Sequence, residues 1–317
     1  MIKDQELNKD WADPRVTGFD NFTKTVPHKP GTTLQSSLSF RTPYNICVVG
    51  ASRGIGAGIA RSYAKAGAST IILAARNTQQ LQDVASQIAN INPHCVVYSV
   101  LCDIASPSSV RDLAAFTREK LGQQQQHLNA VIVSSGYANN RELDVTEGDA
   151  TDEFWVQSFA VNTLGTYHVA HYMVPLLLEA PEDAGRAFLV VGTVAALIRR
   201  GSIAPSKYYI SKMAQMRITE HVAEQFGSRG LFSAVVHPGA VATEMALKAS
   251  PDDNFKQYLI DDPELCGYFF VWLTRQPGSL QWLNGRFLSA KWDPDELVAQ
   301  KQQILKGDLL KLELRAD

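Results

Sequence analysis

The 317-residue chain has only four cysteines, Cys47, Cys95, Cys102 and Cys266, and no two of them have the spacing of a metal site or a redox motif. The N-terminal twenty residues are polar, with acidic residues early, and lack the apolar core and cleavage pattern of a secretory signal. These features do not favour a disulfide-stabilised secreted protein. We expect a reduced, intracellular, cytoplasmic protein without a metal site.

The chain also lacks a strong net charge and a long apolar run. Its net charge is −2, so it has no electrostatic surface suited to nucleic acid or to an anionic membrane. The longest apolar run, 266–273, is far too short to span a bilayer. We interpret it as a buried helical segment, with contact to a membrane as the alternative. These absences leave a small molecule as the expected partner.

From Asn45 onward, apolar strand-like runs alternate with helical patterns. Alternation of this kind predicts an α/β fold: a doubly wound parallel sheet with helices on both faces. The strand-like runs are 45–50, 69–76, 94–103, 128–136, 186–193 and 231–239, and 284–293 could add one more. The helical patterns are 52–68, 77–91, 106–122, 155–178 and 211–226.

Three parts of the chain differ in regularity. Residues 1–40 contain prolines and isolated aromatic residues with no sustained period, which predicts an extended arm. Residues 41–293 carry the alternating pattern and are expected to form a single domain. Residues 294–317 are predicted to be a helical tail, with Asp293 as its N-cap, Pro294 at the first helical position and Gly307 as its stop.

A glycine-rich turn follows the first strand-like run. Gly50, Gly54 and Gly56 have the spacing GxxxGxG rather than GxGxxG. Glycine lets the backbone turn sharply and approach a pyrophosphate, while the next helix offers free N–H groups and the positive end of its dipole. A strand before the turn and a helix after it are the context that supports a dinucleotide site.

The charges beside this turn indicate which dinucleotide binds. A carboxylate at the end of the second strand favours NAD, but this strand ends with Ala75 and Arg76, and Arg53 lies within the turn. Two arginines suit a 2′-phosphate better than a diol. We therefore predict NADP(H) rather than NAD(H). Asp103 ends the third strand and is expected either to accept a hydrogen bond from the adenine amino group or to cap the next helix.

The segment "SKYYISK" offers two candidate catalytic tyrosines. On a helix, Tyr208 and Lys212 lie one turn apart on the same face, whereas Tyr209 points about a hundred degrees away. Free tyrosine has a pKa of about 10, and a nearby ammonium is expected to lower it towards the working pH. Spacing therefore selects Tyr208. The alternative for an isolated match is a surface contact without a catalytic role.

Over about residues 44–292 the sequence resembles the short-chain dehydrogenase/reductase family. The glycine turn is similar to the family's TGxxxGxG, "YYISK" to its YxxxK and "HPGAVAT" to its PGxxxT segment; Asn162 in "VNTLG" stands at the family's helix asparagine, and Thr193 at its catalytic serine. The resemblance implies a Rossmann-like fold. The ending "GRFLSAKWDPDEL" and the long N-terminal arm resemble a fungal subgroup found in secondary metabolism.

The resemblance also implies roles. Tyr208 would be the general acid/base, Lys212 would lower its pKa and hold the nicotinamide ribose, Asn162 would hold a water in a proton relay, and Thr193 would bind the substrate oxygen. Expected cofactor-binding residues are Gly50, Ser52, Arg53, Gly54, Ile55, Gly56, Arg76, Asp103, Ser134, Asn162, Tyr208, Lys212, Pro238, Gly239, Val241 and Thr243.

Two positions depart from the family pattern. Threonine replaces serine at position 193, which keeps the hydroxyl but restricts its rotamer. Val133 and Ser134 replace the two asparagines of the family's NNAG, and the valine side chain makes no hydrogen bond.

These residues predict an NADP(H)-dependent oxidoreductase acting on a carbonyl or secondary alcohol of a small, apolar metabolite. A non-redox isomerase, dehydratase or cyclase that retains the cofactor, and a regulatory protein without turnover, are the alternatives. Phe255, Tyr258, Leu259 and the run 266–273 are candidates for an apolar substrate pocket, with a core or subunit interface as the alternative for that run. The resemblance implies a homodimer or homotetramer formed through the helices after the fourth and fifth strands.

Overall fold

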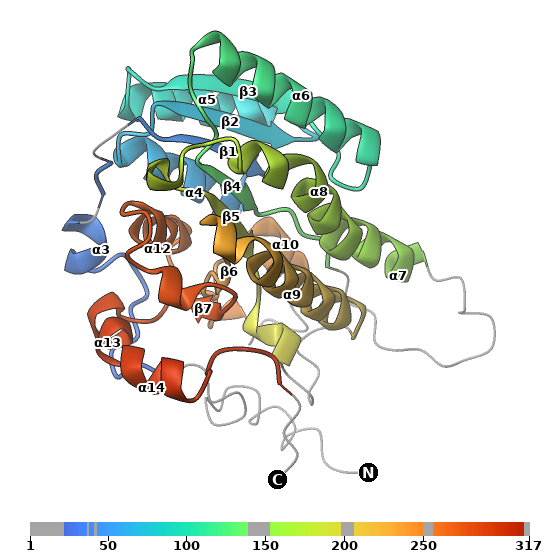
Figure 1. Ribbon diagram of the computed structural model, residues 1–317. Coiled ribbons are helices and arrows are strands. Elements are labelled where there is room, and N and C mark those ends of the chain that lie inside the picture. Colours follow the sequence, from blue (N-terminus) through green and yellow to red (C-terminus); the bar gives the residue numbers. More distant parts are fainter. Residues whose placement is uncertain are drawn as a thin grey trace.

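Seven parallel strands form one sheet in the computed structural model, in the order β3-β2-β1-β4-β5-β6-β7 (Figure 1). The structure describes residues 22–36, 38–40, 43–138, 153–197, 206–249 and 256–313. The strands are β1 (Asn45–Val49), β2 (Thr70–Ala75), β3 (Val96–Leu101), β4 (Ala130–Val133), β5 (Ala187–Val191), β6 (Phe232–His237) and β7 (Phe287–Ser289). This confirms the predicted strands, including the additional strand β7.

The strand order places a switch point between β1 and β4. The chain runs from β1 outward to β3 and then returns to β4 on the other side of β1. At such a point the connections leave in opposite directions, so a crevice opens beyond the carboxyl ends of the strands. The glycine turn after β1 and the Ser134 region after β4 both lie there.

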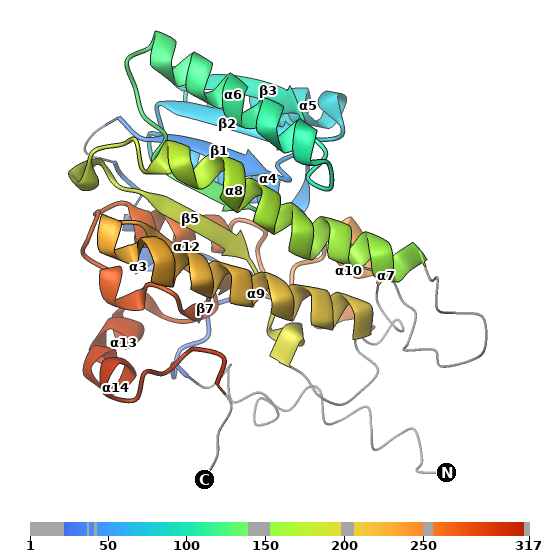
Figure 2. The same ribbon diagram turned by 45° about the vertical axis from the view of Figure 1, so that its right-hand side comes forward.

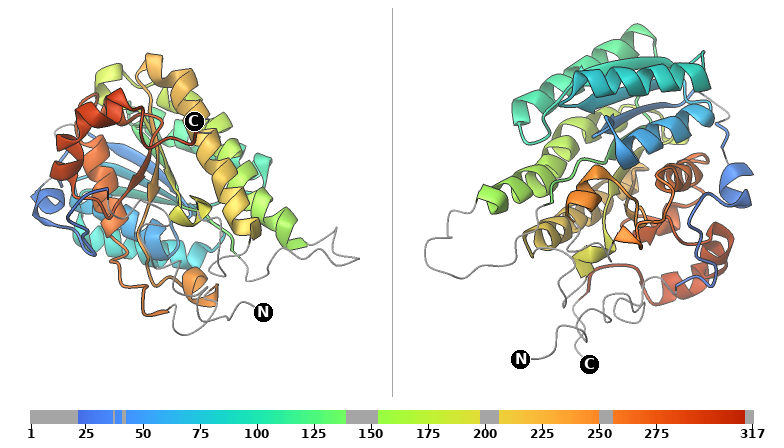
Figure 3. Two further views of the ribbon diagram at one scale, coloured as in Figure 1. Left: turned by 90° about the horizontal axis from the view of Figure 1, so that it is seen from below. Right: turned by 180° about the vertical axis from the view of Figure 1, so that it is seen from behind.

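Helices cover both faces of the sheet, which confirms the predicted doubly wound architecture. On one face, α4 (Gly54–Lys65) packs against α5 (Thr78–Ile91) and α12 (Leu265–Thr274). On the other, α8 (Gly165–Leu177) packs against α6 (Pro107–Gln123) and α9 (Ser206–Phe226). Figure 2 shows α6, α8 and α9 in front of the sheet, and the right panel of Figure 3 shows the opposite face.

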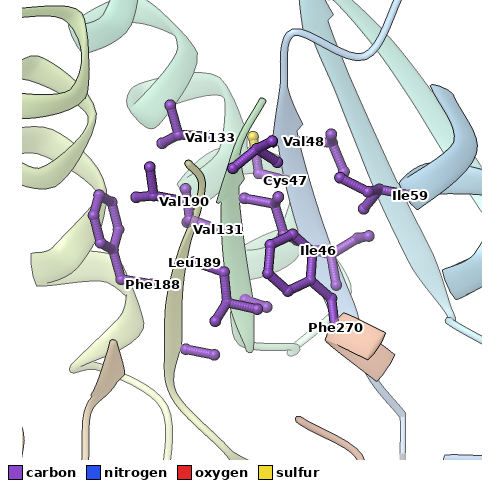
Figure 4. Packing of buried hydrophobic residues seen from close by; sticks show 14 of the residues in the cluster. Ile46, Cys47, Val48, Ile59, Val131, Val133, Phe188, Leu189, Val190 and Phe270 are labelled. Atoms are coloured by element: carbon purple, nitrogen blue, oxygen red, sulfur yellow. The ribbon is translucent and has the colours of Figure 1, made fainter. Parts of the chain in front are cut away.

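The apolar run 266–273 lies in α12 and belongs to the core. Phe269 and Phe270 are completely buried, and the ring of Phe270 lies beside Ile46 of β1 (Figure 4). Full burial of each such ring contributes roughly 1.5–3 kcal/mol. The prediction of a buried helix is confirmed, and of the two alternatives given for this run the structure shows the core. No described helix is long and apolar enough to cross a membrane.

The predicted helix 155–178 is interrupted. It consists of α7 (Glu153–Ser158), a π-helical turn (Phe159–Leu164) and α8. The turn widens the backbone hydrogen bonding, since Gly165 N donates to Ala160 O. π-Turns inside helices are frequent at functional sites, and this one contains Asn162.

The described part of the N-terminal arm packs against the C-terminal part of the fold. The tail forms α13 (Pro294–Ala299) and α14 (Lys301–Lys306) rather than one helix, and Asp293 caps α13 as predicted. The described part of the arm includes the short helix α3 (Thr32–Ser36), which contacts α12 and α13. The ring of Phe22 lies 4.7 Å from that of Trp292.

Candidate active site

The glycine turn has no room for a side chain at Gly50 or Gly56. Gly50 has a φ of 94°, and a Cβ there would lie 2.5 Å from Ser135 N. A Cβ on Gly56 would lie 2.0 Å from Gly50 O. The side chain of Arg53, the N-cap residue of α4, makes no capping hydrogen bond. The backbone here is thus compact and faces the crevice with the amino end of α4, which fits a pyrophosphate.

The second cofactor segment predicted from sequence, 238–243, lies against this turn. A Cβ on Gly54 would meet Thr243 Cγ2 at 3.1 Å. The Thr243 hydroxyl caps α10 (Glu244–Lys248) by accepting from Ala246 N, which leaves its own hydrogen free to donate. Ser52, Arg53, Gly54, Val241 and Thr243 help to line a pocket of about 430 Å³. The fold therefore brings these two predicted segments together.

The charged candidates near the expected adenosine differ in their surroundings. Arg53 forms an ion pair with Glu244, whereas the exposed Arg76 directly follows β2. Asp103 is not the N-cap of α6; Ser106 takes that position and accepts from Ser109 N. The Asp103 carboxylate instead accepts from Ala105 N within its own turn.

Tyr208 and Thr193 meet at the carboxyl end of β5. The two side chains lie close enough for the Thr193 hydroxyl to influence the Tyr208 phenol, although the residues come from α9 and from the segment after β5. Burial raises the pKa of Tyr208 to about 12, and the Thr193 hydroxyl partly offsets this rise. Lys212 is not among the groups that shift this pKa here, and its effect on Tyr208 stays a prediction.

Lys212 is buried on the same helix as Tyr208, as predicted. Its Nζ donates to the carbonyl oxygen of Val191 at 2.8 Å, two residues before Thr193. Burial lowers the pKa of Lys212 to about 7, because the ammonium has little access to water.

The neighbouring tyrosine has a different environment. The Tyr209 side chain is 9% exposed, and its hydroxyl has no hydrogen-bond partner within the described parts of the chain. Burial raises its pKa above the usual range for tyrosine. Only Tyr208 reaches Thr193, so the geometry agrees with the choice made from spacing.

Asn162, in the π-helical turn, forms hydrogen bonds to the segment after β4 and to α9. Its side chain accepts from Tyr137 N at 2.8 Å and donates to Tyr137 O at 2.9 Å and to Ser211 Oγ at 3.0 Å. Ser211 Oγ in turn donates to Tyr208 O at 2.9 Å. Sequence reasoning missed Ser211, which lies between Tyr208 and Lys212. Its position one turn from Tyr208 was the available signal.

His237 is a second residue that sequence reasoning missed. It is buried at the end of β6, and its Nδ1 lies 3.3 Å from Val194 N, next to Thr193. Burial, with a smaller effect of Lys291, lowers the pKa of His237 to about 3. The imidazole is thus neutral at physiological pH and accepts from the Val194 amide.

The remaining predicted residues fall into two groups. Ser134 N donates to Val49 O at 2.8 Å, which joins the segment after β4 to the glycine turn, and Gly239 has a φ of 94°. Of the substrate candidates, Tyr258 is exposed and Leu259 half-buried, while Phe255 lies outside the described residues.

The sequence is similar to that of a known family and of several fungal proteins. The family model for the short chain dehydrogenases matches residues 44–254. The short chain dehydrogenase pgmD of Aspergillus terreus is 32% identical over 297 residues, covering 92% of this chain and 93% of that protein. The short chain dehydrogenase mpl6 of Monascus purpureus is 35% identical over 272 residues, covering 85% and 88%. Both are fungal proteins, in line with the predicted fungal resemblance.

Solved structures show the same fold at lower identity. A 7α-hydroxysteroid dehydrogenase complexed with NADH and 7-oxo glycochenodeoxycholic acid has a TM-score of 0.68 at 21% identity, covering 81% of this chain and 96% of that one. A short chain dehydrogenase from Shigella flexneri 2a complexed with NADP also scores 0.68, at 23% identity with 80% and 98% covered. Sequence motifs, sheet order and relatives agree: the chain belongs to the short-chain dehydrogenase/reductase family.

Proposed function

We propose that the protein is an NADP(H)-dependent oxidoreductase that transfers hydride between the nicotinamide and a carbonyl or secondary alcohol of a small, apolar metabolite. The observation that carries the proposal is the approach of the Thr193 hydroxyl to the Tyr208 phenol, with Lys212 one turn further along α9. The Thr193 hydroxyl can thus orient the substrate oxygen, and the adjacent Tyr208 phenol can exchange a proton with that oxygen.

Each residue of the site has its own role in carbonyl reduction. When bound, the nicotinamide supplies the hydride. Thr193 donates a hydrogen bond to the substrate oxygen, and Tyr208 then transfers its proton to that oxygen. With a pKa of about 12, Tyr208 is protonated at neutral pH, which is the form that reduction requires. Lys212, whose pKa is about 7, assists the return of the proton, and Asn162 holds the surrounding backbone.

Charge distribution supports NADP(H) over NAD(H). Arg76 follows β2 with no carboxylate at the strand end, and Arg53 lies in the glycine turn. The Arg53–Glu244 ion pair is exposed, so little free energy opposes an exchange of Glu244 for a phosphate. The two cofactor-bound structural neighbours carry different dinucleotides, so the choice rests on these charges.

Arg76→Glu tests the cofactor choice. We expect the dissociation constant for NADPH to rise at least about tenfold and that for NADH to change much less, because only NADPH carries the phosphate. Arg111→Glu is the matched control, since Arg111 is also exposed but lies on α6. A wild-type enzyme that prefers NADH would overturn the proposed preference.

A cofactor-consumption assay tests the reaction itself. Purified enzyme with NADPH is screened against apolar ketones, and nicotinamide absorbance is followed together with product. Loss of NADPH equimolar with alcohol supports the proposal. Turnover that leaves NADPH unchanged would replace it with isomerase, dehydratase or cyclase chemistry.

We also propose a homo-oligomer in the cytoplasm, in a fungal secondary-metabolism pathway. Exposed apolar residues of α8, such as Tyr167, border a groove of about 620 Å³ between α8 and α9, which run side by side in Figures 1 and 2. All four cysteines are free, which suits a reducing compartment. Light scattering at micromolar concentration tests the assembly, and a monomer would contradict it.

A further inference from the structure

A buried carboxylate joins the N-terminal arm to the cofactor segment 238–243. The Asp261 side chain is only 1% exposed. Its Oδ2 accepts from Ala240 N at 2.5 Å, and its Oδ1 lies 2.6 Å from Nδ1 of His28. One carboxylate thus uses both oxygens to hold two segments that are far apart in the sequence.

Backbone hydrogen bonds align the same three segments. Asp261 N donates to Ala240 O at 3.0 Å, and Asp262 N donates to His28 O at 2.8 Å. Arm, carboxylate and cofactor segment therefore form one continuous hydrogen-bonded unit. A buried carboxylate that loses a partner becomes strongly unfavourable, so each partner fixes the position of the others.

The conformation of Gly239 depends on this unit. Its φ of 94° favours glycine, and a Cβ at this position would lie 2.6 Å from Asp261 Oδ2. The carboxylate thus occupies the space beside Gly239 and holds the turn that leads from β6 to Thr243. Thr243 lies against Gly54 of the glycine turn, so a shift at Gly239 would reach both sides of the dinucleotide site.

We propose that Asp261 and His28 are positioning residues for the dinucleotide: they hold Gly239 and Ala240, and through them the segment 238–243, in the cofactor-binding conformation. The N-terminal arm then contributes to cofactor binding through His28. The proposal rests on the proposed function and on the role of cofactor-binding segment that the family resemblance implies for 238–243.

The chain offers a matched control for anchoring of the arm. Glu296 of α13 accepts from Lys24 N and from the Thr25 hydroxyl, three or four residues before His28. This contact holds the arm without touching Ala240. Glu296→Ala therefore loosens the arm and leaves the Asp261 contact with Ala240 in place.

Full-length Asp261→Ala, Asp261→Asn, His28→Ala and Glu296→Ala variants test the proposal by fluorescence titration with NADPH. We expect Asp261→Ala to raise the dissociation constant at least about tenfold, since it removes both hydrogen bonds. His28→Ala should have a smaller effect of about threefold. Asp261→Asn should stay near wild type, because its amide oxygen still accepts from Ala240 N. Glu296→Ala should bind as wild type does.

Hydrogen exchange gives a second readout that does not require cofactor. We expect exchange within 238–243 to accelerate in Asp261→Ala and His28→Ala, with β1 unchanged. Uniform acceleration throughout the chain, an unchanged NADPH dissociation constant in His28→Ala, or equal effects of His28→Ala and Glu296→Ala would overturn the proposal. If Asp261→Ala does not fold, His28→Ala and Asp261→Asn decide. If wild-type protein binds no nicotinamide, the proposed function fails, and exchange alone decides whether the positioning holds.

Discussion

The glycine turn after β1 and the tyrosine cluster beside β5 both lie at the carboxyl edge of one parallel sheet but use different parts of the chain. In the turn, glycines bring the backbone together so closely that a Cβ on Gly56 would collide with Gly50 O. In the cluster, Tyr208, Thr193 and Lys212 act through side chains whose proton affinities are shifted by burial. The turn depends on glycines that have no side chain, and the cluster depends on ionisable side chains that are buried away from water.

The difference separates binding from chemistry. A dinucleotide phosphate needs backbone N–H groups and a helix dipole, which remain the same at any pH near neutrality. Proton transfer needs groups that change charge, and burial sets their pKa values. Substitutions in the turn should therefore weaken cofactor binding, while substitutions in the cluster should slow turnover with the cofactor still bound.

Tyr208→Phe should give the largest effect. It removes only the transferable proton, so we expect turnover to fall by about 10²–10⁴ while the NADPH dissociation constant stays near wild type. Tyr209→Phe is the control, since that hydroxyl has no described partner. Steady-state kinetics and fluorescence titration measure both. Equal losses of turnover in the two folded variants would refute the assignment of Tyr208.

Thr193→Val keeps the shape of the side chain and removes its hydroxyl. If its hydrogen bond to the substrate oxygen strengthens in the transition state, the barrier should rise by about 2–4 kcal/mol. Thr193→Ser keeps the donor and frees the rotamer, so activity should persist with a wider substrate range. Near-normal turnover of a folded Thr193→Val enzyme would leave this threonine with a structural role only.

Gly56→Ala should act on the other region. The added Cβ meets backbone rather than a movable side chain, so the turn must shift. We expect cofactor binding to weaken by about 10²-fold, with a loss of stability on the order of 1–3 kcal/mol. Gly122→Ala is the control, because a Cβ there meets nothing within 4 Å. Unchanged NADPH binding in Gly56→Ala would exclude the glycine turn from the cofactor site.

Lys212→Met differs from the other substitutions because it should stabilise the fold. Because the pKa of Lys212 is 10.5 when exposed and about 7 when folded, the unfolded chain binds more protons between these values, and native stability rises with pH there. Below pH 7 the burial cost is fully present, so the variant should gain at most about 5 kcal/mol. Thermal unfolding as a function of pH measures this gain, which should vanish towards pH 10.5. A destabilised variant at pH 6 would show that the buried ammonium is well compensated.

Sequence predicted the parts of the site that depend on local rules. Spacing alone selected Tyr208 over Tyr209, and glycine sterics located the turn after β1. The rise in the pKa of Tyr208 could not be predicted, because burial depends on tertiary packing and not on spacing. His237 and Asp261 were missed because their contacts, to Val194, Ala240 and His28, join segments distant in sequence.

Transfer of deuterium from NADPH labelled on the reactive face of its nicotinamide tests the central proposal most directly. The substrate is the ketone with the fastest turnover in the screen, and mass spectrometry follows the label. Hydride transfer predicts one deuterium on the carbinol carbon of the alcohol for each NADPH oxidised, with the rate lost in Tyr208→Phe and kept in Tyr209→Phe. Product that forms without deuterium while NADPH remains unoxidised would contradict an oxidoreductase.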